Sequence, residues 1–543
     1  MPKIAAGKGR DPTKRPPRRV VAAISRSDIE SALAAMGADD LRAVLGELML
    51  ELDDDARDRV GMVIIRRGAP GSSALVPAPL AERDVAEAVA FAAAIARAGY
   101  ADPADVDDRL HLGLAAFVRN DYAAAHRIFG ALLPVLATGD IDLGQDEMID
   151  EVLSVGTHEC AVQYVVSVYM TAEPARRAEM VRAAVDEMSG FSDLFEPILE
   201  MERAANETLP GLADFLPAWR GIVEGEVSGP RDSGQARRWL REVVCRIEGP
   251  DGLAKIARST RSAEDLGAWC ESLRGAGDWQ AALAAYAEAA DLVRDGAFAR
   301  GRFLDGAALA ARETGTKDLS PWLRRAWYAA PTMPRLCRWL GGATTPQALH
   351  ERVAEALNAC LQQAARQRAF LSLLQGDVAQ AARLLADAPG LGWSDGEHPG
   401  HLMFSLFQTL LGAQEASRPV DAVPDGDMDG ADWDPLTADG DGVPELTTPG
   451  PDDLLRDAGV QGVADAEARQ VVLAAMREAA ERRIAGVTEW KRRRHYGHAA
   501  SLVAACVAID GSTETGRWAA TLRQQYRRFP ALCAELDRSR GAR

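Results

Sequence analysis

The chain has 543 residues and a net charge of −18, with 62 basic residues against 80 acidic ones. The chain is too long to fold around a single hydrophobic core of ordinary size. Its negative charge disfavours general affinity for nucleic acid or anionic membranes but does not exclude a local basic patch. Hydrophobic residues make up 47% and aromatic residues 6% of the chain, which excludes global disorder and, with abundant Ala and Leu, indicates packed helices. We expect an all-α protein.

The N-terminal part reads as a charged arm followed by a small helical unit. Residues 1–24 hold seven basic residues, one acidic residue and four prolines, a composition typical of disorder. At Ser27-Asp28 a polar cap precedes Ile29 and Leu33 at helical spacing. We therefore predict a basic disordered arm over 1–24 and a small helical unit over 25–66.

Residues 80–412 follow one helical pattern after another, and a short phrase recurs among them. It reads Asn120-Asp121-Tyr122, Gly277-Asp278-Trp279 and Gly376-Asp377-Val378, with an Ala five positions after each turn residue. A turn residue, an Asp and a large apolar residue between two helical patterns predict a helical hairpin of the tetratricopeptide (TPR) type. We expect 80–412 to form a TPR-like helical-repeat domain.

The spacing of the phrase is irregular. Its turn residues lie 157 and 99 positions apart, and only the shorter interval is close to a whole number of TPR periods of about 34 residues. The fold predicted is therefore an irregular TPR-like α-solenoid. In its first hairpin, Gly113 and Ala125 are small residues on opposite arms and predict a close helix crossing, while Phe129 would fill the groove to the next helix.

The pattern breaks over 413–452. Residues 421–445 carry nine acidic residues and no basic one, with several Gly and Pro, so this stretch cannot bury enough apolar surface to fold alone. Helical signals resume at Pro451-Asp452-Asp453, a typical helix start. We predict an acidic flexible linker over 413–452 and a C-terminal helical unit over 453–543.

Two stretches of the helical sequence carry recognisable phrases. Residues 122–186 contain His158-Glu159-Cys160-Ala161 after a hairpin, and residues 494–537 run from Tyr496-Gly497-His498-Ala499-Ala500 to Arg527-Arg528-Phe529-Pro530. These stretches resemble the helical region of bacterial proteins that carry a SWIM-type zinc finger. The CxC…CxH zinc ligands of that family are absent, so the resemblance implies a helical-repeat scaffold without the finger's metal or nucleic-acid role.

Two phrases could bind a metal. Asp425, Asp427 and Asp429 match the first half of a calcium-binding loop, but Leu436 stands where the twelfth position should supply a bidentate Glu, so a solvated, protease-accessible linker is favoured. His398 and His401 could ligate zinc together with a nearby acid. The Pro-Gly between them prevents a shared helix face, and an ordered loop is the simpler interpretation.

The same loop spells GxSxG around Ser394, after the apolar Trp393. That motif needs a strand before it and a helix after it on an α/β sheet, which an all-helical pattern does not offer. Since no other catalytic motif has its required setting, we expect no enzymatic activity and no cofactor. Trp393 is instead expected to pack in the loop or contribute to partner binding.

A basic and aromatic stretch follows in the C-terminal unit. Trp490 and Tyr496 flank Lys491, Arg492, Arg493 and Arg494, a combination that could contact phosphates and stack on bases of single-stranded nucleic acid. Docking onto the acidic linker or a plain helix surface are the alternatives, and both are favoured by the overall charge.

The function predicted is that of a scaffold or adaptor that binds a protein or peptide in a helical-repeat groove. Leu112, Ala116, Trp269 and Leu273 would line or support that groove. Regulation by cleavage or cation binding at the acidic linker, and a nucleic-acid adaptor role, remain alternatives.

The expected compartment is the cytoplasm. No apolar run is long enough for a membrane span, and the seven cysteines are scattered without a CxC or CxxC pair, as in reduced cytosolic proteins.

Overall fold

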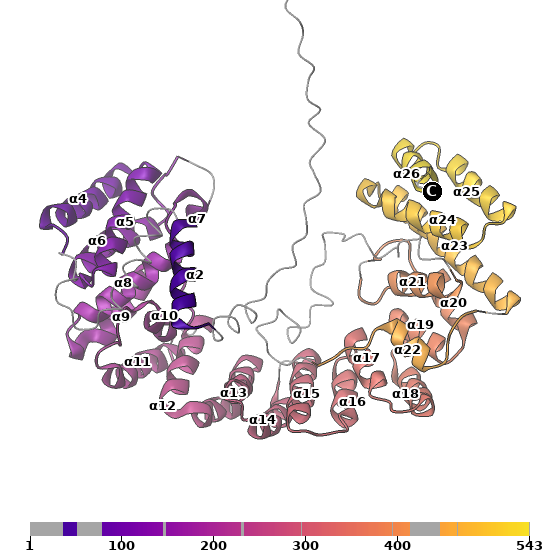
Figure 1. The fold of residues 1–543 in the computed structure, drawn as a ribbon, viewed down its shortest axis with the longest axis horizontal. Helices are drawn as coiled ribbons and strands as arrows, with labels where there is room; N and C mark the ends of the chain where they lie inside the picture. Colours follow the sequence, from indigo (N-terminus) through magenta and orange to yellow (C-terminus); the bar gives the residue numbers. More distant parts are fainter. Residues whose placement is uncertain are drawn as a thin grey trace, which may run out of the picture. The chain divides into compact units, whose positions relative to one another are not determined.

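The computed structural model confirms an all-α fold (Figure 1). It describes residues 36–51, 79–144, 148–229, 233–294, 296–393, 395–412, 446–463 and 465–541. Within these ranges the regular structure is helical, apart from one isolated bridge between Tyr100 and Asp142. The predicted arm over 1–24 and the acidic stretch up to residue 445 lie outside the described residues.

The described residues divide into two compact units, 36–243 and 244–541. The first unit contains α2 (Ala38–Glu51), α4 (Glu82–Ala98), α5 (Pro103–Val118), α6 (Tyr122–Ala137), α7 (Ile149–Val152), α8 (Thr157–Thr171), η2 (Pro174–Arg176), α9 (Arg177–Glu187), α10 (Pro197–Ala204), α11 (Leu212–Val227) and the first part of α12 (Gly234–Thr260). Its core forms where α4, α5 and α8 pack around α6 and continues through α9 to α11. Phe129, Tyr169 and Trp219 are fully buried in it.

The units meet in sequence within α12, which is two helices joined at a kink. Gly249 has φ 63° and ψ −154°, a conformation outside the helical region that glycine adopts readily. Pro250 follows and has no N–H to continue the helical ladder. The Gly-Pro pair thus interrupts α12 close to the division between the units.

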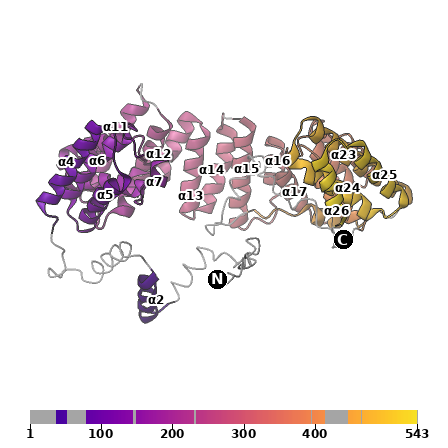
Figure 2. The ribbon, with the colours of Figure 1, turned by 90° about the horizontal axis from the view of Figure 1, so that it is seen from above.

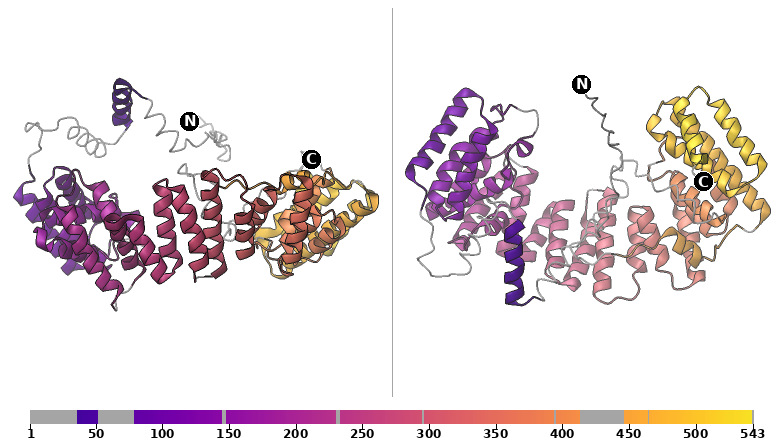
Figure 3. Two further views of the ribbon diagram at one scale, coloured as in Figure 1. Left: turned by 90° about the horizontal axis from the view of Figure 1, so that it is seen from below. Right: turned by 45° about the horizontal axis from the view of Figure 1, so that its top comes forward.

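The second unit runs from the C-terminal part of α12 to the end of the chain. It contains α13 (Ala263–Gly275), α14 (Trp279–Leu292), α15 (Gly296–Glu313), α16 (Ser320–Ala329), α17 (Met333–Gly341), α18 (Pro346–Ala359), α19 (Ala365–Leu374), α20 (Val378–Ala386), α21 (Gly400–Leu410), α22 (Pro451–Asp457), α23 (Ala466–Glu489), η4 (Arg493–His495), α24 (Tyr496–Ile509), α25 (Thr513–Gln525) and α26 (Pro530–Gly541). From α13 to α20 each helix packs on the next, and Figures 2 and 3 show α13, α14 and α15 side by side.

The helices after residue 450 belong to this second unit and share its core. Helix α23 packs on α20 and α21, α24 packs on α23, and α25 and α26 pack on α24. Leu385 of α20 and Met476 of α23 lie in the same buried cluster. The expected boundaries at residues 412 and 453 therefore differ from the units, because the apolar face of α20 is covered by helices that come later in the sequence.

The recurring phrase forms the same turn three times, between α5 and α6, α13 and α14, and α19 and α20. Its first residues, Asn120, Gly277 and Gly376, have φ values of 60°, 71° and 84°. In the second turn, Asp278 N–H donates to Leu273 O at 3.1 Å, and the other two turns make the same bond at 3.0 and 2.9 Å. This is the Schellman arrangement that satisfies the last carbonyls of a helix.

The Asp of each phrase caps the second helix. Asp121, Asp278 and Asp377 have nearly identical backbones, with φ from −83° to −81° and ψ from 65° to 71°. Each carboxylate accepts from the N–H three residues on, at 3.0 to 3.1 Å. A carboxylate here satisfies an orphan N–H and suits the helix dipole, so the phrase both ends one helix and starts the next.

The first hairpin has a close approach of its two helices at Gly113. A Cβ on Gly113 would lie 2.6 Å from the ring of Phe129, so the missing side chain makes room for that ring. Phe129 therefore packs back onto the preceding helix α5. In the second hairpin the ring of Tyr286 fits against Gly306 of the following helix α15 in the same manner, where a Cβ would overlap the ring.

Candidate functional site

A cavity of about 660 Å³ lies in the second unit at one end of helices α15, α16, α17 and α18. Its lining is rich in cationic side chains, namely Arg312, Lys317, Arg338 and Arg352, and contains one acid, Asp318. The segment 446–449, which precedes α22, completes the wall. The cavity therefore combines helix ends with a piece of non-helical chain from a distant part of the sequence.

A buried ion cluster underlies the cavity. Asp305 of α15 is fully buried and accepts from Arg335 Nε at 2.7 Å. Arg338 Nη1 lies 3.8 Å from the other oxygen of that carboxylate, and Arg338 Nε donates to Thr448 Oγ1 at 2.7 Å. Two guanidinium groups thus lie against one buried carboxylate.

Arg352 is fixed at the cavity by neighbouring helix ends. Its Nη1 donates to Trp339 O at 2.6 Å and its Nη2 donates to Ser320 Oγ at 2.7 Å. Asp318 accepts from Ser320 N–H at 2.9 Å, and this bond lowers the pKa of Asp318. Burial lowers the pKa of Arg352, but a guanidinium remains charged near neutral pH. Arg352 therefore stays cationic, and the carboxylates of Asp318 and Glu355 both favour its charged form.

The segment 446–449 lies directly on α17. A Cβ on Gly341 would overlap Pro449 Cγ, so only glycine allows this close approach without rearrangement. Leu446 packs against the main buried cluster of the unit. Residues 446–449 thus form a short non-helical segment that packs on the helices of the same chain. The Arg338–Thr448 hydrogen bond, the contact of Pro449 with Gly341 and the apolar packing of Leu446 hold it there.

The predicted phosphate contacts lie between α23 and α24, on the turn after α23 and in η4. Lys491, Arg492, Arg493 and Arg494 are all exposed, and Trp490 is 65% exposed. Within the described ranges, Lys491, Arg492 and Arg493 form no ion pair with a carboxylate. The turn therefore presents an indole ring and a dense group of cations to solvent.

The histidines predicted as possible zinc ligands lie in an aromatic cluster. His398 is buried; its Nε2 donates to Pro389 O at 2.9 Å, and its Nδ1 accepts from Gly400 N–H at 2.9 Å. Both nitrogens therefore fix the loop. The ring of His401 lies 5.6 Å from Trp393. Among the described residues, no group of three or more His, Cys, Asp or Glu side chains could hold a metal ion.

His498 of α24 is the member of this cluster that the sequence did not single out as a site. Its ring lies 5.0 Å from Trp393 and 5.1 Å from His401, and within the described part of the chain neither ring nitrogen has a hydrogen-bond partner. Burial, followed by the charge of Arg483 and the neighbouring histidines, lowers the pKa of His498 to about 3. His498 is therefore neutral near pH 7.

The residues predicted to line a partner groove are mostly interior. Ala116, Trp269, Leu273 and Trp393 are buried, and Leu112 is half-buried. They pack within the cores of their units, so they support the helices and offer a partner little or no surface. Large apolar residues at helical spacing point inward, and the sequence alone did not separate this inner face from a binding face.

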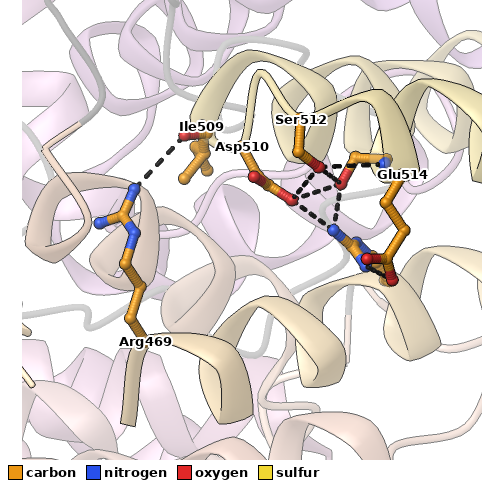
Figure 4. Close-up of polar contacts among 7 residues, drawn as sticks. Arg469, Ile509, Asp510, Ser512 and Glu514 are labelled. Carbon is orange, nitrogen blue, oxygen red and sulfur yellow. Dashed lines mark hydrogen bonds and ion pairs between the residues drawn. The ribbon is translucent and has the colours of Figure 1, made fainter. Parts of the chain in front are cut away.

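Polar contacts hold the C-terminal helices together (Figure 4). Arg477 of α23 donates to Asp510 Oδ2 at 2.5 Å, and Ser512 Oγ donates to the same oxygen at 3.0 Å. Arg469 Nη1 donates to Leu411 O at 3.0 Å and Nη2 donates to Ile509 O at 3.4 Å, so one guanidinium serves the C-terminal carbonyls of two helices. These contacts are structural.

All seven cysteines are free thiols, and most are buried. Burial raises the pKa of Cys160, Cys337 and Cys506 to about 12, so these thiols are protonated near neutral pH. A protonated buried thiol is a poor nucleophile and a poor metal ligand. Cys160, Cys337 and Cys506 therefore act as small apolar side chains in the cores.

Two predicted sites cannot be placed. Asp425, Asp427 and Asp429 of the possible calcium loop lie outside the described residues, and so does Ser394 of the GxSxG phrase. The linker predicted over 413–452 lies outside the described residues as far as 445, so its cleavage or cation binding stays a prediction, whereas residues 446–449 pack on α17. The flanking residues that are described, Trp393 and Asp395, belong to the loop that His398 fixes.

Comparison with protein-family models and with curated proteins finds no match to this chain. The resemblance to SWIM-associated helical proteins therefore stays a prediction. A search of the described helices for membrane-crossing candidates finds none with the necessary length and apolarity.

Proposed function

We propose that this protein is an adaptor whose second unit binds a short acidic peptide of a protein partner at the cationic cavity of α15 to α18. The observation that carries the proposal is the position of segment 446–449, which lies on α17 as a peptide ligand would. The helix ends hold this peptide without strand pairing, using a glycine contact and the Arg338 bond to Thr448. A neighbouring peptide can use the same kind of contact.

The charge of the cavity supports an acidic ligand. The carboxylate of Asp305 lies against Arg335 and Arg338, and four cationic side chains line the cavity beside a single acidic one, Asp318. A peptide carboxylate would offset this excess charge and could form a two-pronged pair with a guanidinium. The cavity is also large enough for a few side chains rather than for a single ion.

The helical architecture supports an adaptor with several contact points. Exposed Phe298 at the start of α15, Tyr328 at the end of α16 and Leu361 after α18 lie at the opposite end of these helices from the cavity. Arg335 stacks on Phe298 and Arg324 on Tyr328, which holds the two rings in place. Aromatic and arginine side chains are common anchors of protein interfaces. The TPR-like solenoid interpretation remains part of this proposal.

The test is selection of displayed random peptides on the full-length chain, followed by fluorescence anisotropy of the selected peptides. We expect enrichment of acidic peptides and at least about tenfold weaker binding to Lys317→Glu, because a close attractive charge becomes repulsive. Arg302→Glu is the matched control, since Arg302 is exposed on α15 and does not line the cavity. Failure to enrich acidic peptides, or equal binding to the two variants, would contradict the proposal.

A further inference from the structure

We propose that the turn between α23 and α24 binds single-stranded nucleic acid, with Trp490 stacking on a base and Lys491, Arg492, Arg493 and Arg494 contacting phosphates. This site is independent of the cavity and of the adaptor function proposed above. It rests on a comparison of this turn with the three hairpin turns that carry the recurring phrase.

The backbone of the turn matches those three hairpins. Lys491 has φ 54°, close to the 71° of Gly277. Arg492 has φ −82° and ψ 72°, against −82° and 71° for Asp278. Arg492 N–H donates to Val487 O at 2.8 Å, which is the bond that closes the other turns. The turn at Lys491 and Arg492 therefore has the backbone geometry of the three hairpin turns.

The residues at this fourth turn are the reverse of those that stabilise the other three. Lys491 occupies the left-handed position, which strains a residue with a side chain. Arg492 replaces the capping Asp, and no side chain caps the following helix η4. The arginines also gather at the N-terminal end of η4 and α24, where the helix dipole is already positive. Folding stability alone does not explain this sequence.

The same replacements bring the side chains to the surface. At the position of Arg493 the other turns carry Tyr122, Trp279 and Val378, which are buried or packed against a core. Arg493 is exposed instead. Trp490 stands one residue before the left-handed position and is 65% exposed, although an indole gains free energy from burial. The turn thus pairs an open aromatic face with cations.

This combination fits single-stranded nucleic acid better than other anions. Unpaired bases can stack on an exposed indole while lysine and arginine contact the backbone phosphates. A duplex hides its base faces, and the acidic side chains of a peptide have no flat ring that could stack on Trp490. The net charge of −18 disfavours general attraction, so binding would be local to this turn.

The site makes two quantitative predictions. Four phosphate contacts to a single strand give a slope of about −2.8 in a plot of log affinity against log salt concentration. Loss of one stacked base by Trp490→Ala weakens binding by roughly 5- to 150-fold. A surface that binds phosphates by charge alone would show the dependence on salt, but Trp490→Ala would not weaken its binding.

The experiment measures anisotropy of a labelled single-stranded oligothymidylate with the full-length chain. The decisive variant is Lys491→Gly with Arg492→Asp, which restores the residues found at Gly277 and Asp278. It should raise the midpoint of thermal unfolding while binding falls at least tenfold. Higher stability together with weaker binding would show that the binding site itself was lost, because a misfolded protein would be less stable as well as weaker in binding.

Arg302→Glu again serves as the control for a reversed surface charge, and it should bind the oligonucleotide like the wild type. The proposal is overturned if no oligonucleotide binds, if the double variant or Trp490→Ala binds as the wild type does, or if duplex DNA binds equally well. Stronger binding of polyglutamate or of phosphatidylserine vesicles at this turn would also overturn it.

Discussion

At the scale of single residues, the aromatic cluster around Trp393 shows how burial sets chemistry. Two of its histidines, His398 and His498, have lowered pKa values, mainly because burial disfavours the charged form. Neutral imidazoles can pack on an indole as apolar rings. The cluster therefore behaves as part of the core of the second unit, and its stability should depend on pH.

We predict that His498 makes the second unit less stable in acid. The unfolded chain binds a proton at His498 near pH 6.5, while the folded chain does so only near pH 3. The stability that neutral His498 contributes to the folded state is therefore fully present above pH 6.5. It is lost as the pH falls from 6.5 towards 3, by up to about 1.4 kcal/mol per pH unit. Arg483, His401 and His495 face the ring and act in the same direction.

The measurement is the free energy of unfolding in urea at pH values from about 7 to about 4. His498→Phe replaces the imidazole by an apolar ring of similar size and should give a shallower dependence on pH. The quantity compared is the slope of the unfolding free energy against pH, because the substitution also changes packing and therefore the stability at every pH. Equal slopes for the wild type and the variant would show that His498 is not the group responsible.

Residue-level prediction from the sequence was better for turns than for surfaces. The phrases around Asp121, Asp278 and Asp377 were recognisable as hairpin turns because a turn depends on a few neighbouring positions. Ala116 and Trp269 were expected to line or support a groove, and they are interior; the sequence did not decide between the two roles, because which side of a helix faces a neighbour depends on helices far along the chain. His498 became part of the Trp393 cluster through contacts across about 100 residues of sequence.

At the scale of elements, the hairpin turn is the unit that recurs. Three hairpins were predicted from their phrase, and the structure has a helix pair at each. The fourth turn has the same backbone, but Lys491 and Arg492 hide it from any search for Gly or Asn followed by Asp. The backbone geometry is compatible with more than one sequence, at a cost in stability.

We predict that Gly277→Lys with Asp278→Arg lowers the free energy of unfolding by about 2 kcal/mol, from left-handed strain and the lost cap together. No neighbouring atom lies within 4 Å of the position that a Cβ on Gly277 would take, so crowding adds little. Ala276→Lys is the control, because Ala276 is exposed and has a right-handed backbone. Chemical denaturation measures both, and equal stabilities would contradict the turn argument.

At the scale of the whole molecule, the chain forms two compact units with separate cores. Gly249-Pro250 is one of many Gly- or Pro-containing breaks between helical patterns, so the sequence alone did not reveal where the units divide. It also treated residues 453–543 as a separate unit. That boundary followed the composition of 413–452, whereas packing of α23 on α20 joins the flanking helices across it.

We predict two separable unfolding transitions, reported by the buried thiols. Cys160 is in the first unit, and Cys270, Cys337 and Cys506 are in the second. Peptide mapping of alkylated cysteines along a denaturant series should show Cys160 becoming reactive over one range and the other three over another. Reactivity of all four over a single range would show that the units unfold together.

Arg469 has a consequence for how the chain can be divided. It bonds Leu411 O before residue 413 and Ile509 O after residue 445, and Val463 N–H donates to Leu410 O at 3.1 Å. Fragments 1–412 and 446–543 would therefore carry complementary halves of one interface. Produced as separate polypeptides, the two fragments could reassemble as a split protein. The hydrogen bond from Arg469 to Leu411 O would form only when the two fragments are bound to each other.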